Sequence, residues 1–551
     1  MKTKIRKLKI LMAASEAVPY IKSGGLGDVC GALPKALKQA GHDARIVIPR
    51  HWGIDLSKYH HNKPVRAMCV HTGGGPIWCG VYEVTFDGVT AYMIDHNGFF
   101  GRSGLYDDGK KEYDDNPQRF SFFCRAVLQL CKDEGFQPDV IHCNDWQTAL
   151  IPAYLKTWDS GDLFYGRTAT VFTIHNIGYQ GVFHAACVPF LGLWKSDMQP
   201  DKFEDHGAVN LMKGAIHYCD AVSTVSPSYA QEILGPVGSS GLHEFLGRRK
   251  QDLFGILNGV DYDHWDPATD RFLPAKYSPS NMSGKAVCKS DLQREFCLHQ
   301  DPNVPLIGIV TRFTEQKGLH QLMQVIKKIC WQMRVQFAIV GAGEKYLEDF
   351  FGGLPREFGG QVGAWIGYDN GKAHRVEAGC DFFLMPSMYE PCGLNQIYSL
   401  KYATLPIVRA TGGLRDTVWS YDERTGHGNG FSFDTPTPQA IFDAVGWAVS
   451  TYYDRRHHFD QMRQQAMKAH FSWADSARHY DVMYHRAILR KVGSYEHLVE
   501  FIEEKSVVGH HVSSPKRKPT KKSFKAKPAI EKCDTRKISK TKSAGNKQRG
   551  R

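Results

Sequence analysis

The residues best suited to chemistry in this chain stand in short clusters that follow apolar runs. The first is Lys22-Ser-Gly24-Gly25-Leu26, between the apolar run Leu8 to Ala14 and a helix-like segment. A glycine loop in this setting brings backbone N–H groups up to an anion, with a helix N-terminus behind it. A second glycine pair, in Thr411-Gly412-Gly413-Leu414, lies nearly 400 residues later. Two such loops predict one negatively charged ligand held between two domains.

Other polar residues follow further predicted strands. They are Asn144 and Asp145 after Asp139 to His142, His175 and Asn176 after Thr170 to Ile174, Arg312 and Lys317 after Leu306 to Val310, and Glu390 after Asp381 to Met385. Open parallel sheets bind their ligands beyond the carboxyl ends of the strands. We therefore expect these side chains to collect on two edges that face each other.

This set of residue types is suited to a sugar carried on a diphosphate. Arg312 and Lys317 can neutralise the phosphates, and the helix N-termini after Gly393 and Gly412 can add backbone donors. Hydroxyl groups of a sugar need polar partners, which Asp145, His175, Asn176 and Glu390 could supply. The pattern contains no metal-ligand cluster, which fits stabilisation of a leaving diphosphate by side-chain cations and helix dipoles.

In the first half, each of these features has a simpler interpretation. Lys22 could be a solvated loop lysine, and a glycine pair alone could be an ordinary turn. His175 could be a structural histidine at a strand end. Asp145 could cap the helix that follows it.

The second half leaves similar alternatives open. Arg312 and Lys317 flank Glu315, so a surface ion pair is one interpretation. Glu390 could be an ordinary surface acid. Its position after an apolar strand, with Pro391 and Gly393 following, favours a cleft instead.

The elements that must position these residues alternate between strands and helices. Arg45 to Ile48 is a second strand, and the helix before it ends at Ala40, with Pro34 near its start and Gly41 beyond its end. Further predicted elements are a hairpin around Asp87-Gly88, a helix over 119–134, a helix over 318–328, and strands at 335–340 and 406–409. The pattern predicts an open α/β fold that is used twice.

Length and composition agree with a two-domain enzyme. The chain has 551 residues, too many for one core, and no apolar run approaches the ~20 residues of a membrane span. The basic N-terminus resembles a signal peptide, but Lys9 interrupts a short apolar part, so we interpret this segment as the first strand. The 14 Cys lack metal-like spacing, which favours reduced thiols in a cytoplasmic protein.

The net charge of +12 comes from the C-terminus. From Ser514 to Arg551 there are 15 Lys and Arg against two acidic residues, so the rest of the chain is close to neutral. A segment of this composition is expected to be disordered. We expect this basic tail to bind polyanions only weakly, as polycations do.

Several blocks together resemble one known family. Lys22-Ser-Gly-Gly-Leu26 is similar to the Lys-x-Gly-Gly-Leu signature of bacterial glycogen synthases and plant starch synthases. The family's other blocks are matched in order by Phe172-Thr-Ile-His-Asn176, Ser223-Thr-Val-Ser-Pro227, Leu257-Asn-Gly-Val-Asp261, Thr314-Glu-Gln-Lys-Gly318, Glu390-Pro-Cys-Gly-Leu394 and Thr411-Gly-Gly-Leu414. Each block alone is weak evidence, whereas the ordered set, spread over about residues 8 to 490, is specific.

The resemblance implies two Rossmann-like domains in the GT-B arrangement, with a cleft between them. It implies transfer of glucose, usually from ADP-glucose, to the non-reducing end of an α-1,4-glucan such as glycogen, with retained configuration and neither metal nor cofactor. The expected divisions are an acceptor-side domain at 1–256, a nucleotide-sugar domain at 257–470, helices crossing back at 471–504 and the basic tail at 505–551.

The resemblance also implies roles for single residues. Glu390, His175, Lys317 and Arg312 are expected to be catalytic: Glu390 as the site carboxylate, His175 beside the reacting sugar, and the two cations on the phosphates. The expected substrate-binding residues are Lys22, Gly24, Gly25, Asp145, Asn176, Tyr368, Cys392, Gly393, Thr411 and Gly412. Among these, Tyr368 is expected to stack on the nucleotide base.

Two departures from the family pattern and three alternatives stay open at this stage. The tail after about Lys505 has no counterpart in the family, so the resemblance says nothing about it. Met388 stands where the family more often has a basic residue, so one polar contact is in doubt. The motifs do not distinguish ADP-glucose from UDP-glucose as donor. Another retaining GT-B transferase with a small acceptor, or a catalytically silent glucan-binding scaffold, would share much of the pattern.

Overall fold

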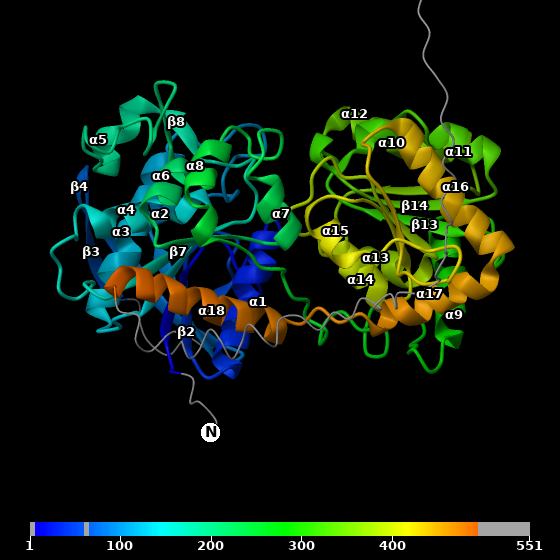
Figure 1. The fold of residues 1–551 in the computed structure, drawn as a ribbon, viewed down its shortest axis with the longest axis horizontal. Helices are drawn as coiled ribbons and strands as arrows, with labels where there is room; N and C mark the ends of the chain where they lie inside the picture. Colours follow the sequence, from blue (N-terminus) through cyan, green and yellow to red (C-terminus); the bar gives the residue numbers. More distant parts are fainter. Residues whose placement is uncertain (1–5, 60–65, 494–551) are drawn as a thin grey trace, which may run out of the picture. The chain divides into compact units, whose positions relative to one another are not determined.

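The computed structural model describes residues 6–59 and 66–493. In this part of the chain, two large sheets are covered by helices (Figure 1). The first sheet has the strand order β12-β11-β7-β6-β1-β2-β5-β4-β3, and the second has the order β15-β14-β13-β16-β17-β18. The predicted α/β pattern, used once in each half, is confirmed.

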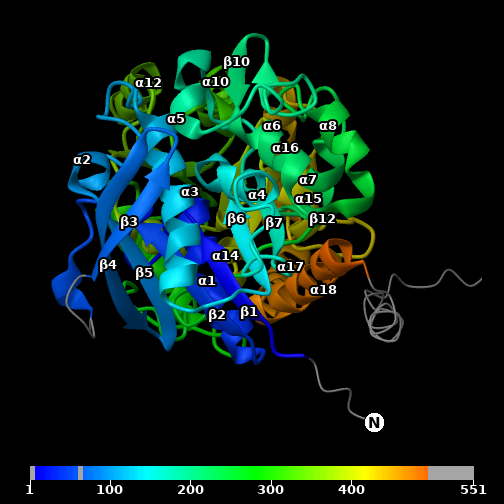
Figure 2. The ribbon, with the colours of Figure 1, turned by 90° about the vertical axis from the view of Figure 1, so that its left-hand side faces the viewer.

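The first sheet is parallel apart from one edge. Its parallel strands are β1 (Lys9–Ala13), β2 (Asp43–Pro49), β5 (Val89–Asp95), β6 (Val140–Asn144), β7 (Ala169–Ile174), β11 (Ala221–Thr224) and β12 (Leu253–Gly255). Antiparallel strands β3 (Arg66–Thr72) and β4 (Gly75–Phe86) complete the edge seen in Figure 2. The predicted hairpin is confirmed, because β4 and β5 are joined at Asp87-Gly88.

The first helix differs from its prediction. Helix α1 (Gly25–Gln39) begins inside the glycine loop, so Pro34 lies in its interior rather than near its start. Proline cannot donate to the carbonyl one turn earlier, and an interior proline costs about 3 kcal/mol in an isolated helix. Burial of Leu33 and Leu37 against the sheet offsets that cost, since both side chains are fully buried.

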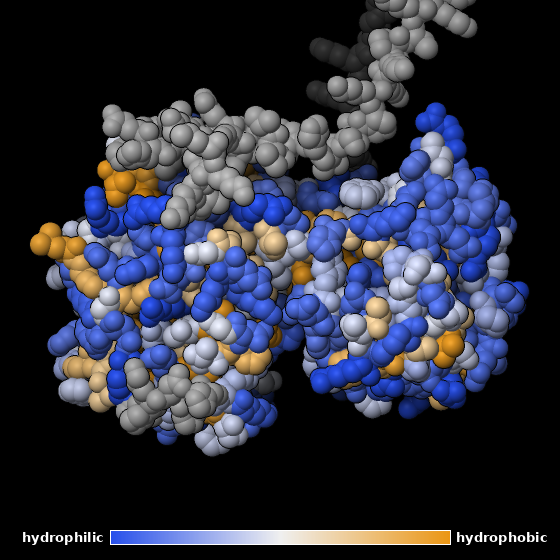
Figure 3. All heavy atoms as spheres, turned by 90° about the horizontal axis from the view of Figure 1, so that it is seen from below, coloured by the Kyte–Doolittle hydropathy of each residue, from blue (hydrophilic) through white to orange (hydrophobic). Residues whose placement is uncertain are grey.

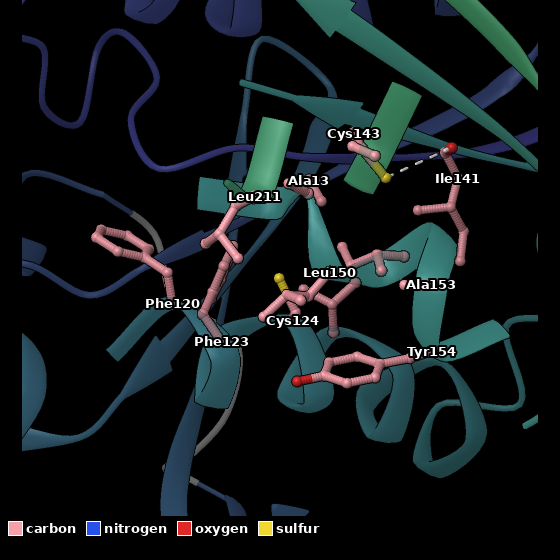
Figure 4. Close-up of a cluster of buried hydrophobic side chains, with 14 of the residues drawn as sticks. Ala13, Phe120, Phe123, Cys124, Ile141, Cys143, Leu150, Ala153, Tyr154 and Leu211 are labelled. Atoms are coloured by element: carbon pink, nitrogen blue, oxygen red, sulfur yellow. Dashed lines mark hydrogen bonds between the residues drawn. The ribbon is translucent and has the colours of Figure 1, made fainter. Parts of the chain in front are cut away.

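The core of the first half is built on helix α3 (Asn116–Asp133), which confirms the predicted amphipathic helix. Its side chains Phe120, Phe123 and Cys124 lie near Leu150 and Tyr154 of helix α4 (Leu150–Lys156) in one buried cluster (Figure 4). The described cysteines are free thiols, and most of them are buried.

The second sheet is parallel throughout. Its strands are β13 (Leu306–Val310), β14 (Gln336–Gly341), β15 (Val362–Ile366), β16 (Phe382–Met385), β17 (Leu405–Arg409) and β18 (Phe431–Phe433). The single helix predicted over 318–328 is wrong. Two short helices, α10 (Leu319–Met323) and α11 (Ile326–Gln332), take its place because Val325 leaves the helical backbone conformation with its side chain buried.

Helix α18, the last helix of the described chain, packs against the first half. After α16 (Pro438–Asp454) and α17 (Arg456–Lys468), α18 (Trp473–Val492) lies against α1 and β7, where Tyr480 and Tyr484 are buried in the first half's core. The domain boundaries expected at 256/257 and 470/471 stay predictions. Residues 494–504 and the basic tail lie outside the described residues.

The face of the molecule in Figure 3 is mostly hydrophilic, with small separate hydrophobic areas. Among the residues described, none of the helices combines the length and hydrophobicity needed to cross a bilayer.

Candidate active site

Parallel pairing brings the predicted residues of each half to one edge of its sheet. In the first half, Lys22, Asp145 and His175 follow β1, β6 and β7, which are neighbours in the sheet. In the second half, Arg312 follows β13, and Glu390 and Thr411 follow the adjacent strands β16 and β17. These are the strand ends at which open α/β sheets bind ligands.

Lys22 is held at the start of the glycine loop by an acid of the following helix. Its Nζ donates to Asp28 Oδ1 at 3.0 Å, and 41% of its side chain is exposed. Burial acts against the charged form, but Asp28 outweighs it and raises the pKa of Lys22, with smaller contributions from Tyr368 and Glu16. Lys22 is therefore a fixed cation at neutral pH.

The two glycines of the loop leave their backbone open. A Cβ built at Gly24 or Gly25 would meet no atom within 4 Å, whereas one at Gly27 would collide with Lys22 Cβ. Gly24 also has an extended backbone that any residue can adopt. Packing within the protein thus explains why residue 27 must be glycine, but it does not explain the glycines at 24 and 25. A bare backbone at Gly24 and Gly25 is suited to close approach by a ligand.

Glu16 anchors this loop and was missed by the sequence analysis. It is 2% exposed and accepts from the N–H and Oγ of Ser23 and from Tyr106 OH. Burial raises the pKa of Glu16 in spite of these donors. Its signal in the sequence was an acidic residue inside the apolar stretch that follows the first strand.

Asp145 is buried in a strained conformation. Its φ of 54° is unusual for a residue with a side chain. Its Oδ1 accepts from the His175 N–H at 2.7 Å, and its side chain makes no capping bond to the following 3₁₀ turn, so the cap interpretation fails. Burial raises the pKa of Asp145 to about 7 against the effect of the His175 and Asn176 amides.

His175 is a neutral imidazole. Burial lowers its pKa to about 3. Nε2 lies 2.9 Å from Asn144 Oδ1, whose amide nitrogen donates to Ala13 O and His142 O. The Asn144 oxygen is thus an acceptor, so Nε2 carries the proton and Nδ1 keeps a lone pair.

Lys317 and Glu390 form a close ion pair. Nζ of Lys317 lies 2.9 and 2.7 Å from the two carboxylate oxygens, and Ser387 Oγ donates to Oε2 at 3.0 Å. The side chains are 16% and 6% exposed. Lys317 thus pairs across the sheet edge with Glu390 rather than with Glu315, and Glu390 is not an ordinary surface acid.

Arg312 and Tyr368 remain exposed. Within the described part of the chain, no carboxylate lies at ion-pair distance from Arg312. Tyr368 is 76% exposed, and its hydroxyl is only 3.5 Å from Asn370 Oδ1, so its ring is accessible for stacking. Asn176 is partly engaged, since its Nδ2 lies 3.4 Å from Gln316 Oε1 of the second half.

The Glu390 block continues into a tightly packed turn. Cys392 is buried, and burial raises its pKa to about 12, which keeps the thiol neutral. Gly393 has a φ of 69°, and a Cβ there would lie 2.5 Å from Gln396 Oε1. Arg409, which the sequence analysis did not select, donates to the carbonyls of Ser387 and Met388 and so supports the loop before Glu390.

The predicted phosphate donors at Thr411 and Gly412 are already engaged. Thr411 Oγ1 donates to Glu232 Oε2 at 3.0 Å, and the Gly412 N–H donates to Glu232 Oε1 at 2.8 Å. Glu232 belongs to the first half, at the end of helix α7 (Pro227–Glu232). A carboxylate thus occupies the position where the sequence suggested a phosphate oxygen, and no local pattern indicated this partner.

Two Rossmann-like sheets, each with basic and acidic groups at its strand ends, define the class of a GT-B glycosyltransferase. The protein-family model "Starch synthase catalytic domain" matches residues 9–248, and the family model "Glycosyl transferases group 1" matches residues 296–466. With these matches and relatives such as one 43% identical over 495 residues, the chain belongs to the glycogen synthase and starch synthase family, and the resemblance stated from its motifs is confirmed.

Individual relatives agree with this assignment. Glycogen synthase 1 of Geobacter metallireducens is 43% identical over 495 residues, which cover 89% of this chain and 98% of the relative. Glycogen synthase of Aeromonas salmonicida is 41% identical over 490 residues, covering 88% and 100%.

Solved structures give the same picture. The catalytic domain of starch synthase IV from Arabidopsis thaliana, bound to ADP and acarbose, is 33% identical, with a TM-score of 0.80 over 88% of this chain and 100% of that one. A sucrose-phosphate synthase from Thermosynechococcus elongatus, at 16% identity with a TM-score of 0.54, shares the fold.

Proposed function

We propose that this protein is a glycogen synthase that transfers glucose from ADP-glucose to the non-reducing end of an α-1,4-glucan with retention of configuration. The observation that carries the proposal is the close ion pair of Lys317 with the buried Glu390, at the strand ends of a family member that also presents Lys22 and an open glycine loop. The starch synthase IV structure with ADP supports the choice of donor.

The cations have a direct role in this reaction. As the bond from the sugar to the diphosphate breaks, negative charge grows on the phosphate oxygens, and Lys22, Arg312 and Lys317 would stabilise it. Fixed charges in a partly desolvated site act without reorganisation, which makes them effective in a transition state. Glu390 holds the Lys317 ammonium in place through both carboxylate oxygens.

The first half would hold the transferred glucose. The neutral His175 offers the lone pair on Nδ1 to a sugar hydroxyl, and Asp145 can accept from another when it is ionised. Tyr368 would stack on the adenine, while Cys392 and Gly393 would contribute backbone contacts to the donor. The division into acceptor and donor domains near residue 256, and a cytoplasmic location, belong to the same proposal.

The test supplies the purified chain with ADP-glucose and glycogen, with UDP-glucose in parallel. We expect ADP release and lengthened glucan chains, and a markedly lower rate with UDP-glucose. A low-mass glycoside as the product would indicate a small-acceptor transferase. Binding of glycogen without nucleotide release would indicate a silent scaffold, and either result would overturn the proposal.

A further inference from the structure

Helices α7 and α15 cap each other across the two halves of the molecule. Helix α15 (Gly412–Thr417) has its N-terminal Thr411 hydroxyl and Gly412 N–H bound to Glu232, at the C-terminal end of α7. In return, Asp416 of α15 accepts from Ser228 N at 2.8 Å and from Ser228 Oγ at 2.6 Å, in the first turn of α7. Each helix thus provides the carboxylate that the other helix's first turn requires.

The same contact reaches the backbone of the candidate active site. The Gly413 N–H donates to Glu390 O at 3.1 Å, and a Cβ at Gly412 would lie 1.9 Å from that oxygen. Ser226, which is fully buried before α7, donates through Oγ to Pro391 O at 2.5 Å. Helix α7 of the first half therefore holds the Glu390-Pro391 backbone of the second half, directly and through α15.

Arg409 completes this arrangement. Glu232 favours the charged form of Arg409, although burial is the stronger influence and lowers the pKa of that guanidinium. Arg409 in turn donates to the Ser387 and Met388 carbonyls just before Glu390. The Glu232 carboxylate thus contacts the start of α15 and acts electrostatically on Arg409, and both groups contact the segment that carries Glu390.

We propose that Glu232 is a positioning residue for the glucosyl transfer: by capping α15 from the other half, it fixes Glu390 relative to the half that carries His175. Thr411 and Gly412 then serve the contact between the halves and are not phosphate ligands. This inference rests on the proposed synthase function. It differs from the expectation stated from the sequence, in which the two residues donate to phosphate.

The two assignments predict opposite effects of removing Glu232. If Glu232 positions Glu390, Glu232→Ala lowers kcat, since a misplacement of ~1 Å can cost about 100-fold in rate, while the KM for donor changes little. If instead the α15 amide is a phosphate ligand that Glu232 occupies, the same variant frees the amide, and the Kd for ADP falls. We expect kcat to drop at least ~10-fold with an ADP affinity within about threefold of the original.

Matched variants make the test specific. Gln231→Ala changes the exposed neighbour on α7 and should leave kcat unchanged. Glu232→Gln keeps one acceptor oxygen for the Gly412 N–H and should recover part of the rate. In a Thr411→Val background, Glu232→Ala should have a smaller effect than in the original chain, because the two side chains act through one contact.

Each outcome has a clear consequence. A normal kcat in Glu232→Ala, or tighter ADP binding, would overturn the inference. If Glu232→Ala does not fold, as circular dichroism would show, Asp416→Asn and Ser228→Ala test the reciprocal cap with the same readouts. Absence of transfer in the unmodified chain would instead refute the proposed function, so the two failures are distinguishable.

Discussion

At the scale of single residues, the first half has a buried acid and a buried base whose pKa values lie in the reverse of their usual order. Burial raises the pKa of Asp145 to about 7 and lowers that of His175 to about 3. Near neutral pH the imidazole is therefore uncharged, and the carboxyl group is the one that titrates. Such displaced values are typical of functional sites.

This assignment predicts the pH dependence of the reaction. If ionised Asp145 accepts from a sugar hydroxyl, kcat/KM should rise with pH and level off above about pH 7. Asp145→Asn should lower the rate and remove this rise, because it has no titrating carboxyl group. Initial rates between pH 5.5 and 8.5 (a range of roughly 1.5 units on either side of the expected pKa) provide the measurement; a rise that persists in Asp145→Asn would assign it to another group.

The ion pair of the second half gives a second prediction. Lys317→Ala and Glu390→Ala should each lower kcat by ~100-fold or more, since one preorganised charge contact is worth about 3 kcal/mol in the transition state. Glu315→Ala, an exposed acid two residues before Lys317, is the matched control and should retain activity. Steady-state rates with ADP-glucose and glycogen test this prediction. Near-normal turnover in either variant would show that the substituted residue has no part in the mechanism.

At the scale of elements, a buried hydrogen-bond chain joins α18 to three strands of the first sheet. Tyr484 OH lies 2.9 Å from His142 Nδ1, and His142 Nε2 lies 2.6 Å from Thr173 Oγ1, which is 2.6 Å from Ser223 Oγ. Thr173 lies on β7, two residues before His175, which directly follows this strand, so the chain also supports the edge that carries the site.

Removing one member of this chain should destabilise the protein. Tyr484→Phe leaves His142 Nδ1 buried without a partner, which typically costs about 1–3 kcal/mol. Arg478→Ala, which removes only an exposed ion pair on the same helix, should cost less than ~1 kcal/mol. Thermal and denaturant unfolding measure the loss of stability in the two variants. An equal loss in both would mean that the hydrogen-bond chain contributes little to stability.

The same histidine makes stability depend on pH. Burial lowers the pKa of His142 from 6.5 to about 3, so between these values the unfolded chain binds a proton that the folded chain does not. The contribution is fully present above pH 6.5 and is lost as the pH falls. His175 acts in the same direction. Asp145 acts in the opposite direction, because its pKa is raised in the folded chain, so its contribution to the stability of the fold is lost as the pH rises from about 4 to 7.

Two histidines outweigh one aspartate, so these three groups should lower the unfolding midpoint as the pH falls from 6.5 to 5. His142→Gln should reduce this pH dependence by the contribution of about one proton bound on unfolding. Unfolding midpoints measured at half-unit pH steps test the sign, and a slope that is unchanged in His142→Gln would contradict it.

At the scale of the whole molecule, the two sheets are joined by reciprocal contacts close to the site rather than by the connecting chain alone. The Ser228–Asp416 and Glu232–Gly412 contacts come from short helices that are distant in sequence. They link the strand ends that carry the site residues of both halves, so the geometry of the site depends on how the halves meet.

The basic tail should not take part in this geometry. We expect the chain truncated after Ser513 to retain its transfer rate with ADP-glucose and glycogen, because the family resemblance and the site both lie before that point. The full chain and the truncated chain are compared at equal concentration; loss of activity on truncation would show that the tail acts in catalysis or in binding the acceptor.

Local signals in the sequence determined the elements and the chemical inventory of this protein. Strand periodicity located β13 and β16, the Asp87-Gly88 pair located the hairpin, and strand ends identified Lys22, Asp145 and Glu390. Hydrophobic periodicity and turn chemistry act over a few residues, so they can be recognised without the fold. The boundaries of α1 and the break between α10 and α11 could not, because packing overrides local preference there.

Only the tertiary structure decided which groups are partners. Lys317 could have paired with Glu315, two residues away, yet it pairs with Glu390; Thr411 and Gly412 could have been free donors, yet they bind Glu232. Burial, which shifts the pKa values of Glu16, Asp145 and His175, is likewise a property of the assembled fold. A sequence gives the order of its charged groups, whereas their interactions depend on distances across space and on the exclusion of water.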